Sequence, residues 1–256
     1  MLRVDAGALR IGDIITLQNL PLSSYLSAEG ILLDDIYVSD DLSKFEDNLF
    51  QVHLQRQYSA AQEYDSFLRE YQLDENSEVE EIHLKKYMEA LKRGRDNEKK
   101  LNDGYLKNKN GINVVFGDVI QLFHVKSMKY LKVLNGKLAK DERENMRIAL
   151  DSHGDSSSWI QLLPRYKIHR EGDNIQTKLE VILSVADRKN EFIHCADRKP
   201  QPGYPREVNC SLDISSWSLV IFESSLDAAD NKFLLASQLV SLYDPETLTN
   251  ISIVDK

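Results

Sequence analysis

A short β-hairpin pattern recurs along the chain, and this repetition constrains the fold more than any other feature. In its clearest copy, the mostly apolar run Gly117–Val125 is followed by a polar turn at 126–129 and by a return strand that starts at Tyr130. The same pattern begins at Ile14 and, more loosely, at Leu179. Repetition at a fixed period decides the architecture of a chain, so it is interpreted first.

The copies are evenly spaced except for one long interval. Val119 and Val181 are 62 positions apart, and a fourth copy begins 59 positions later at Val240. Ile14 and Val119 are 105 positions apart, which leaves room for an insertion. Three units are too few for a β-propeller, which needs at least about four blades. The sequence therefore predicts a mainly β fold with an α insertion: a β-trefoil that carries a two-helix arm, followed by the start of a second trefoil.

This interpretation divides the chain into segments. The β-trefoil is expected over 1–54 and 111–222, the helical arm over 55–110, a linker over 223–236, and the first hairpin of a truncated second domain over 237–256. A lone hairpin is marginally stable. The chain is therefore expected to be cut from something longer, or to pack its last hairpin against the first domain.

Each of the three units closes with a strand that an aromatic residue leads. These residues are Phe50, Trp159 and Trp217, and the two tryptophans are 58 positions apart. We interpret all three as equivalent core residues of the repeat, and not as a platform for stacking a ligand.

Residues 55–110 break the β rhythm. They lack proline after Arg56, and Ser59 with Gln62 and Ser77 with Glu80 fit capping boxes. Apolar residues then recur at helical spacing, which predicts two antiparallel helices. The expected stripes are Ala60, Tyr64, Phe67, Leu68 and Tyr71 in the first helix, and Val79, Ile82, Tyr87 and Leu91 in the second. The polar stretch 95–110 is expected to be a poorly ordered return to the β body.

Charges on the arm are segregated, with acidic residues near its tip and basic residues after them. The simpler interpretation is a solvated helix with pairs such as Glu81 and Lys85. The alternative is a docking lever for a regulatory protein, with Lys85, Lys86, Lys92 and Arg93 as its contacts.

Composition excludes several classes of protein. The net charge of −9 argues against a general nucleic-acid binder. Two cysteines, Cys195 and Cys210, are no disulfide framework, and reduced thiols are expected. No apolar run approaches the roughly 18 residues that span a bilayer, and the N-terminus carries no apolar signal stretch. A soluble chain without direct membrane insertion, in the cytoplasm, is expected.

Residues that could perform chemistry do not form a known pattern. None of the six histidines belongs to an HExxH pair, and His194 and Cys195 with Cys210 lack a fourth ligand. Phosphate-binding and nucleophile-elbow motifs are also missing. We interpret Asp141 and Glu142 as solvated turn residues. No catalytic residue, metal site or cofactor is therefore expected.

Several blocks of the chain are similar to one known family. Gly117–Leu131 resembles GDVIQLLHLKSNKYL, and Met146–Asp151 resembles MRVTLD. Ser158–Lys167, Glu207–Cys210 and Ser216–Phe222 are similar to SWFYIQPFYK, EVNC and SWKIVLF. All of these belong to the N-terminal suppressor domain of the inositol trisphosphate receptor and ryanodine receptor family of calcium-release channels. Tyr58-Ser59-Ala60 begins the arm as the inositol trisphosphate branch does.

The resemblance implies a non-catalytic regulatory domain in calcium signalling. It would lower ligand affinity and couple ligand binding to the gate, with neighbouring ligand-binding domains and adjacent subunits of a homotetramer as partners. It implies a location on the cytoplasmic face of the endoplasmic reticulum and a ligand pocket beyond Lys256. Tyr166 matches a family aromatic in the coupling surface and Lys167 accompanies it, whereas Arg165 stands where the family has Phe.

Two other functions remain open because a fold does not fix a function. The domain could be a free-standing trefoil scaffold in a large cytoplasmic or cytoskeletal assembly. It could also be a sugar-binding trefoil like the repeats of protein mannosyltransferases, although the lack of a secretory signal argues against this.

Overall fold

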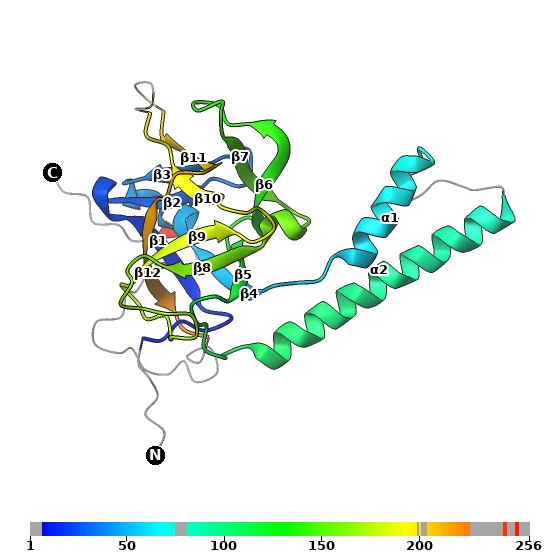
Figure 1. Ribbon diagram of the computed structural model, residues 1–256, viewed down its shortest axis with the longest axis horizontal. Coiled ribbons are helices and arrows are strands. Elements are labelled where there is room, and N and C mark those ends of the chain that lie inside the picture. Colours follow the sequence, from blue (N-terminus) through cyan, green and yellow to red (C-terminus); the bar gives the residue numbers. More distant parts are fainter. Residues whose placement is uncertain are drawn as a thin grey trace, which may run out of the picture.

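The computed structural model describes residues 7–74, 81–198, 200 and 204–225, together with the short pairs 243–244 and 249–250. A β-rich body forms one end of the molecule, and two helices project from it to one side (Figure 1). The chain leaves the body after β4 (Phe50–Leu54) and returns to it before β5 (Val119–His124).

Six strands form a closed ring at the centre of the body. They are β1 (Ile14–Asn19), β4, β5, β8 (Ile160–Pro164), β9 (Glu180–Val185) and β12 (Ser216–Glu223). Each pairs antiparallel with the next, and β12 pairs back onto β1. Closure removes the free strand edges that would otherwise invite aggregation.

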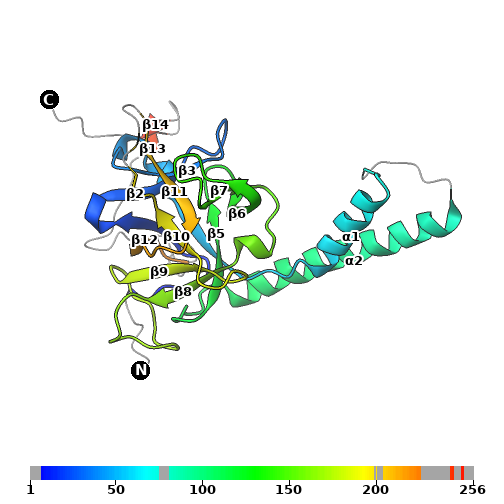
Figure 2. The same cartoon turned by 45° about the horizontal axis from the view of Figure 1, so that its top comes forward.

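Three hairpins cover one end of this ring (Figure 2). They are β2 (Ser24–Ala28) with β3 (Ile36–Ser39), β6 (Lys129–Leu138) with β7 (Met146–Asp151), and β10 (Phe192–Cys195) with β11 (Arg206–Ser211). Because β11 pairs with both β3 and β7, the three hairpins meet one another. The three predicted hairpins are β1 with β2, β5 with β6, and β9 with β10, and each of these pairs is present. Each predicted unit supplies two ring strands and one hairpin.

Short segments complete the described elements. The 3-10 helices are η1 (Leu20–Leu22), η2 (Leu42–Asn48) and η3 (Ser156–Ser158), and two-residue strands β13 (Tyr243–Asp244) and β14 (Thr249–Asn250) pair with each other. Most of the expected linker at 223–236 and of the expected hairpin at 237–256 lies outside the described residues.

The hydrophobic core fills the ring, and its composition contradicts the prediction for Trp159. Phe50, Ile160 and Trp217 are almost fully buried and each begins the inward-facing alternation of its strand. Trp159 is only half-buried and stands outside this core. The predicted equivalence of the two tryptophans is therefore wrong by one residue. A slip of one position in a strand moves a side chain to the opposite face.

The arm consists of α1 (Ser59–Glu70) and α2 (Ile82–Lys109), which pack against each other. The prediction of a poorly ordered stretch over 95–110 is wrong, because α2 stays helical to Lys109. Its half-buried positions continue at helical spacing through Arg95, Glu98 and Asn102. Polar side chains on this face find partners near the base of the arm, which an apolar stripe would not reveal.

Glu98 supplies one of those partners and replaces the predicted capping box. Its carboxylate accepts hydrogen bonds from Ser59 Oγ (3.0 Å) and from the backbone amides of Ala60 and Ala61 (3.1 Å each). The N-cap residue Tyr58 makes no capping bond of its own. A carboxylate at a helix N-terminus is favourable because it satisfies free amides and opposes the helix dipole. The second predicted box, Ser77 with Glu80, lies outside the described residues.

The predicted apolar stripes are partly correct. Tyr64 and Phe67 of α1 are buried. On α2, Ile82 and Tyr87 are 67% and 58% exposed, although Tyr87 makes an edge contact with Phe67 at 5.4 Å between ring centroids. The half-buried leucine and methionine residues of this helix are Leu84, Met88, Leu91 and Leu106, while Val79 lies outside the described residues.

Candidate interaction surface

The root of the arm is fixed to the β body by polar contacts that are at least partly buried. Gln121 of β5 donates from Nε2 to Tyr58 Oη (2.8 Å) and to Ser158 Oγ (2.6 Å). Its Oε1 accepts from the backbone amide of Arg56 (3.1 Å), and Trp159 Nε1 donates to the carbonyl of Arg56 (3.1 Å). Trp159 thus attaches the arm instead of filling the core.

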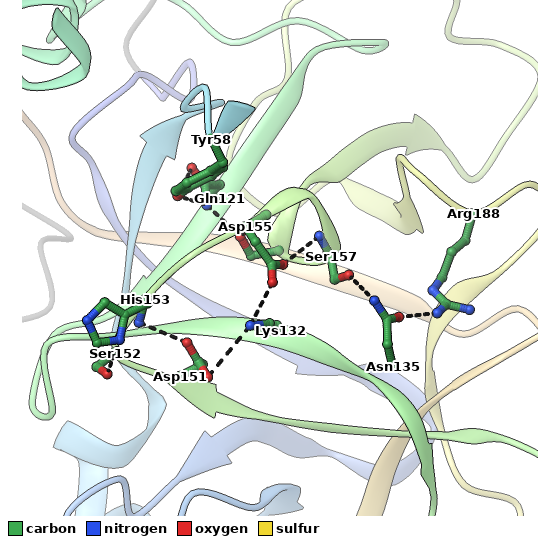
Figure 3. A network of polar contacts seen from close by, with 11 residues as sticks. Tyr58, Gln121, Lys132, Asn135, Asp151, Ser152, His153, Asp155, Ser157 and Arg188 are labelled. Atoms are coloured by element: carbon green, nitrogen blue, oxygen red, sulfur yellow. Dashed lines mark hydrogen bonds and ion pairs between the residues drawn. The ribbon is translucent and has the colours of Figure 1, made fainter. Parts of the chain in front are cut away.

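These contacts continue across the body as a polar network (Figure 3). Ser158 Oγ donates to the carbonyl of Asp155 (2.6 Å), and Lys132 Nζ lies 2.7 Å from the Asp155 carboxylate. At the far end, Arg188 of the β9–β10 turn donates to Asn135 Oδ1. The other labelled members are Asp151, Ser152, His153 and Ser157. The network connects the arm root to the second and third repeat units.

A second feature is the loop between β2 and β3, whose tip is apolar and exposed. Ile31, Leu32 and Leu33 are 64%, 88% and 63% exposed. The carboxylate of Glu29 holds this tip by accepting hydrogen bonds from all three backbone amides at 3.0, 2.6 and 3.0 Å. Its hydrogen bonds from Leu33 and Leu32 hold the pKa of Glu29 below its ordinary value.

The other side of the same loop is also fixed. Lys129 Nζ donates to the carbonyl of Gly30 (2.9 Å) and pairs with Asp34 (2.7 Å). Gly30 has φ +75°, and a Cβ at this position would stand 2.6 Å from Ser127. Only glycine fits such a site. The apolar tip is therefore preformed, and contiguous exposed apolar residues commonly mark interaction sites.

Sequence reasoning did not single out this loop. A detectable signal is present: three consecutive large apolar residues follow Gly30 in a turn, directly before Asp34 and Asp35. Turns are usually polar, so folding alone does not explain three large apolar residues in this one.

The residues that the family resemblance singled out lie on the surface. Arg165, Tyr166 and Lys167 are exposed in the β8–β9 loop. Tyr166 Oη donates to Glu180 (2.9 Å), and this hydrogen bond raises the pKa of Tyr166. The arm cations are elsewhere, on α2: Lys85, Lys86 and Arg93 are exposed and Lys92 is half-buried. The structure thus places these two groups on different parts of the molecule (Figure 1).

Glu142 requires a correction, because it is not a solvated turn residue. It is 6% exposed and accepts hydrogen bonds from the amides of Asp197 (2.8 Å) and Arg198 (3.0 Å) and from Asn209 Nδ2 (2.9 Å). It therefore joins the β6–β7 hairpin to the β10–β11 hairpin.

Within the described part of the chain, no group of three or more His, Cys, Asp or Glu side chains is arranged to hold a metal ion. Cys195 and Cys210 are buried free thiols on paired strands. None of the described helices is both long enough and apolar enough to cross a membrane.

The described residues thus form a closed β body with an inserted helix pair and a preformed apolar loop. Residues 5–228 match the model of the inositol 1,4,5-trisphosphate/ryanodine receptor family. The chain belongs to this family.

Two individual relatives extend the comparison. The inositol 1,4,5-trisphosphate receptor itr-1 of Caenorhabditis elegans is 29% identical over an alignment of 272 positions, which covers 98% of this chain and 9% of that protein. The chain therefore spans about a tenth of the length of this receptor. A structural-genomics structure of a Caenorhabditis elegans protein of unknown function has a TM-score of 0.55 and 10% identity, and covers 85% of this chain and 98% of that one. That likeness concerns the fold alone.

Proposed function

We propose that this chain is the non-catalytic N-terminal regulatory (suppressor) domain of an inositol trisphosphate receptor-like calcium-release channel. The match over residues 5–228 supports this proposal, as does the small share of the related receptor that the chain covers. The domain is a β-trefoil over 1–54 and 111–222 with a helical arm over 55–110. The six-stranded ring with three capping hairpins supports that description.

The observation that carries the proposal is the rigid apolar tip at Ile31–Leu33. Burying one such side chain contributes about 1.5–3 kcal/mol. Docking of all three would contribute several kcal/mol to an interface before the costs of association are subtracted. Because the loop is already fixed by Glu29 and Lys129, little conformational entropy is lost on docking. The partner is a ligand-binding domain of the same receptor or of an adjacent subunit.

Regulation then follows from linkage between docking and ligand binding. If the docked state binds inositol trisphosphate more weakly than the undocked state, docking lowers the affinity of the receptor for this ligand. The coupling free energy between docking and ligand binding is typically about 1–3 kcal/mol. The exposed Tyr166 loop and the arm cations provide further surfaces for contacts between subunits on the cytoplasmic face of the endoplasmic reticulum. Rigid-body motion of the domain would transmit the change to the gate.

The test uses a receptor that contains this segment. Leu32→Asp places a charge on the most exposed residue of the tip, and Leu212→Asp is the control because Leu212 is 72% exposed on the β11–β12 turn. We expect Leu32→Asp to raise the affinity for radiolabelled inositol trisphosphate by about fivefold or more, because docking is lost. Leu212→Asp should leave affinity unchanged.

Unchanged affinity in Leu32→Asp would refute the docking role of the tip. Tyr166→Ala tests the coupling surface separately, through calcium release. The substitution should change the ligand concentration that gives half-maximal calcium release. If neither ligand affinity nor calcium release changes, Tyr166 has no role in the coupling.

A further inference from the structure

The arm carries an open groove of about 580 Å³ along one side of α1. Its lining includes Phe67, which is buried, and Tyr71 and Tyr87, which are 46% and 58% exposed. The two tyrosine rings lie 4.7 and 5.4 Å from the ring of Phe67, measured between centroids. The groove therefore presents aromatic surface to solvent at the end of α1 that is farther from the β body.

Two carboxylates accompany these rings. Glu63 and Glu70 both line the groove and are exposed. They are seven residues apart, close to two helical turns, which places them on one side of α1 about 10 Å apart along its axis. Among the described residues, neither carboxylate forms an ion pair, and none of the side chains that line the groove is a cation.

The opposite charge lies on α2, in a row that we call the cationic row. Its members Lys86, Arg93 and Lys100 are exposed and are also seven residues apart. Glu89 and Asp96 lie beside the row, but α2 contains nine lysine and arginine residues against four aspartate and glutamate residues, a net charge of +5. With three acidic residues and one arginine, α1 has a net charge of −2. The two helices of one arm thus carry complementary charges.

The cationic row points away from α1. Its members come two positions after Leu84, Leu91 and Glu98, which are half-buried. Glu98 accepts hydrogen bonds from the first turn of α1, so that side of α2 faces α1. Two positions rotate a side chain by about 200° around a helix. The arm also projects away from the β body (Figure 1), so another molecule can reach both the groove and the row.

We propose that the groove on α1 receives the cationic row on α2 of a second copy of this chain. The equal spacing allows two cations of the row to pair with Glu63 and Glu70 at the same time. A single exposed ion pair contributes little, whereas several charges in one arrangement contribute more. The aromatic end of the groove adds a contact that a solvated pair of charges lacks.

The aromatic end also determines which cation lies where. Arg93 is the only arginine of the row, and its guanidinium stacks on Tyr71 and Tyr87 beside Glu70 of the other copy. The arm already contains one contact of this kind, because the guanidinium carbon of Arg95 lies 4.6 Å from the ring centre of Tyr64. The second glutamate then pairs with one of the two lysines of the row.

This contact joins two different surfaces, so it is heterologous and leaves one groove and one row free in each pair of copies. Heterologous contacts close into rings when the rotation between copies permits. The proposal rests on the proposed function only for its place in the receptor, where it would connect the arms of adjacent subunits. Its test uses no inositol trisphosphate, so the two proposals can fail separately.

The test is disulfide cross-linking between copies of the full chain, for which both native cysteines are suitably buried. Ser66→Cys places a thiol in the groove between the two glutamates. Ala90→Cys and Asn97→Cys place one beside the cationic row, on either side of Arg93, without removing a charge. We expect Ser66→Cys to cross-link with one of these two variants, and the one that reacts gives the direction of the helices. Ser152→Cys, exposed on the β body, is the matched control and should react slowly with both.

Charge reversal tests whether the two surfaces recognise each other. Glu63→Lys together with Glu70→Lys, in the chain with the groove cysteine, should slow cross-linking by about tenfold, the effect of two exposed ion pairs. Reversal of the cationic row in the other chain should restore the rate, through Lys86→Glu, Arg93→Glu and Lys100→Glu. In 1 M NaCl the wild-type surfaces should also react slowly, because the Debye length falls to about 3 Å.

Equal rates for Ser66→Cys and Ser152→Cys with both α2 variants would overturn the proposal. So would a failure of the reversed row to restore the rate, since the attraction would then come from net charge alone. In either case the groove would belong to a different basic partner. All substituted side chains are exposed, and circular dichroism of each variant establishes that a lost cross-link is not lost folding.

Discussion

Gly154→Ala should weaken the attachment of the arm to the β body. Gly154 precedes η3, and a Cβ built on it would stand 2.2 Å from Tyr58 Oη and 2.9 Å from Gln121 Nε2. Real Cβ atoms do not approach other atoms so closely. Tyr58 or Gln121 must therefore move, and the hydrogen bonds between them are the contacts at risk.

The size of the effect follows from those contacts. Loss of two partly buried hydrogen bonds costs about 1 kcal/mol each. Forcing a methyl group into a packed site adds about 1–3 kcal/mol. The variant should thus lose roughly 3–5 kcal/mol in free energy of unfolding, from these two effects together. Hydrogen exchange should increase in α1 and α2, since the root is their connection to the body.

Urea unfolding measures the free energy, and Gly104→Ala is the matched control. Gly104 lies in α2 with nothing within 4 Å of an added Cβ, so this change should stabilise the helix by about 1 kcal/mol. In a Tyr58→Phe background the 2.2 Å contact disappears, and Gly154→Ala should cost at least about 1 kcal/mol less. The reasoning fails if Gly154→Ala is as harmless as Gly104→Ala.

Three further outcomes test other parts of the structure. Trp217→Ala should cost about 3–5 kcal/mol in urea unfolding, and Trp159→Ala should cost less, because only Trp217 fills the core. Burial lowers the pKa of His53 to about 4, so the unfolded state binds more protons than the folded state between that value and 6.5. The free energy of unfolding should therefore fall by about 2 kcal/mol from pH 7 to pH 5. His53→Phe should reduce this fall. Burial raises the pKa of the Cys195 and Cys210 thiols, so a thiol reagent should label the folded chain only as fast as it unfolds.

The hairpins were predictable because largely buried strands leave short, mostly apolar runs bounded by polar turns in the sequence. The runs at Ile14, Val119 and Leu179 mark β1, β5 and β9 within a residue. The helices were also predictable as elements, since the span 55–110 lacks proline after Arg56. The lengths of the two helices were not predictable. The lower half of α2 is held by polar partners such as Glu98 and Asn102, which no apolar periodicity records.

The candidate surface was harder to predict, since its properties depend on distant residues. Exposed leucines indicate a preformed interaction surface only when other residues hold the backbone of their loop in place. Here Glu29 is near in sequence, whereas Lys129 comes from another repeat unit. Glu142 shows the same limit: it is a polar residue in a turn, and its partner Asn209 lies in another hairpin.

Trp159 shows how an insertion changes a repeat. Position by position, Ile160 fills the place that Phe50 and Trp217 occupy in the other units, 57 residues before Trp217. The arm enters between the first and second units, and its root needs a donor for the carbonyl of Arg56. The indole of Trp159 provides that donor one residue before the strand. The larger aromatic therefore faces outward in the unit that follows the arm, and the sequence spacing that suggested equivalence reflects the attachment of the arm instead.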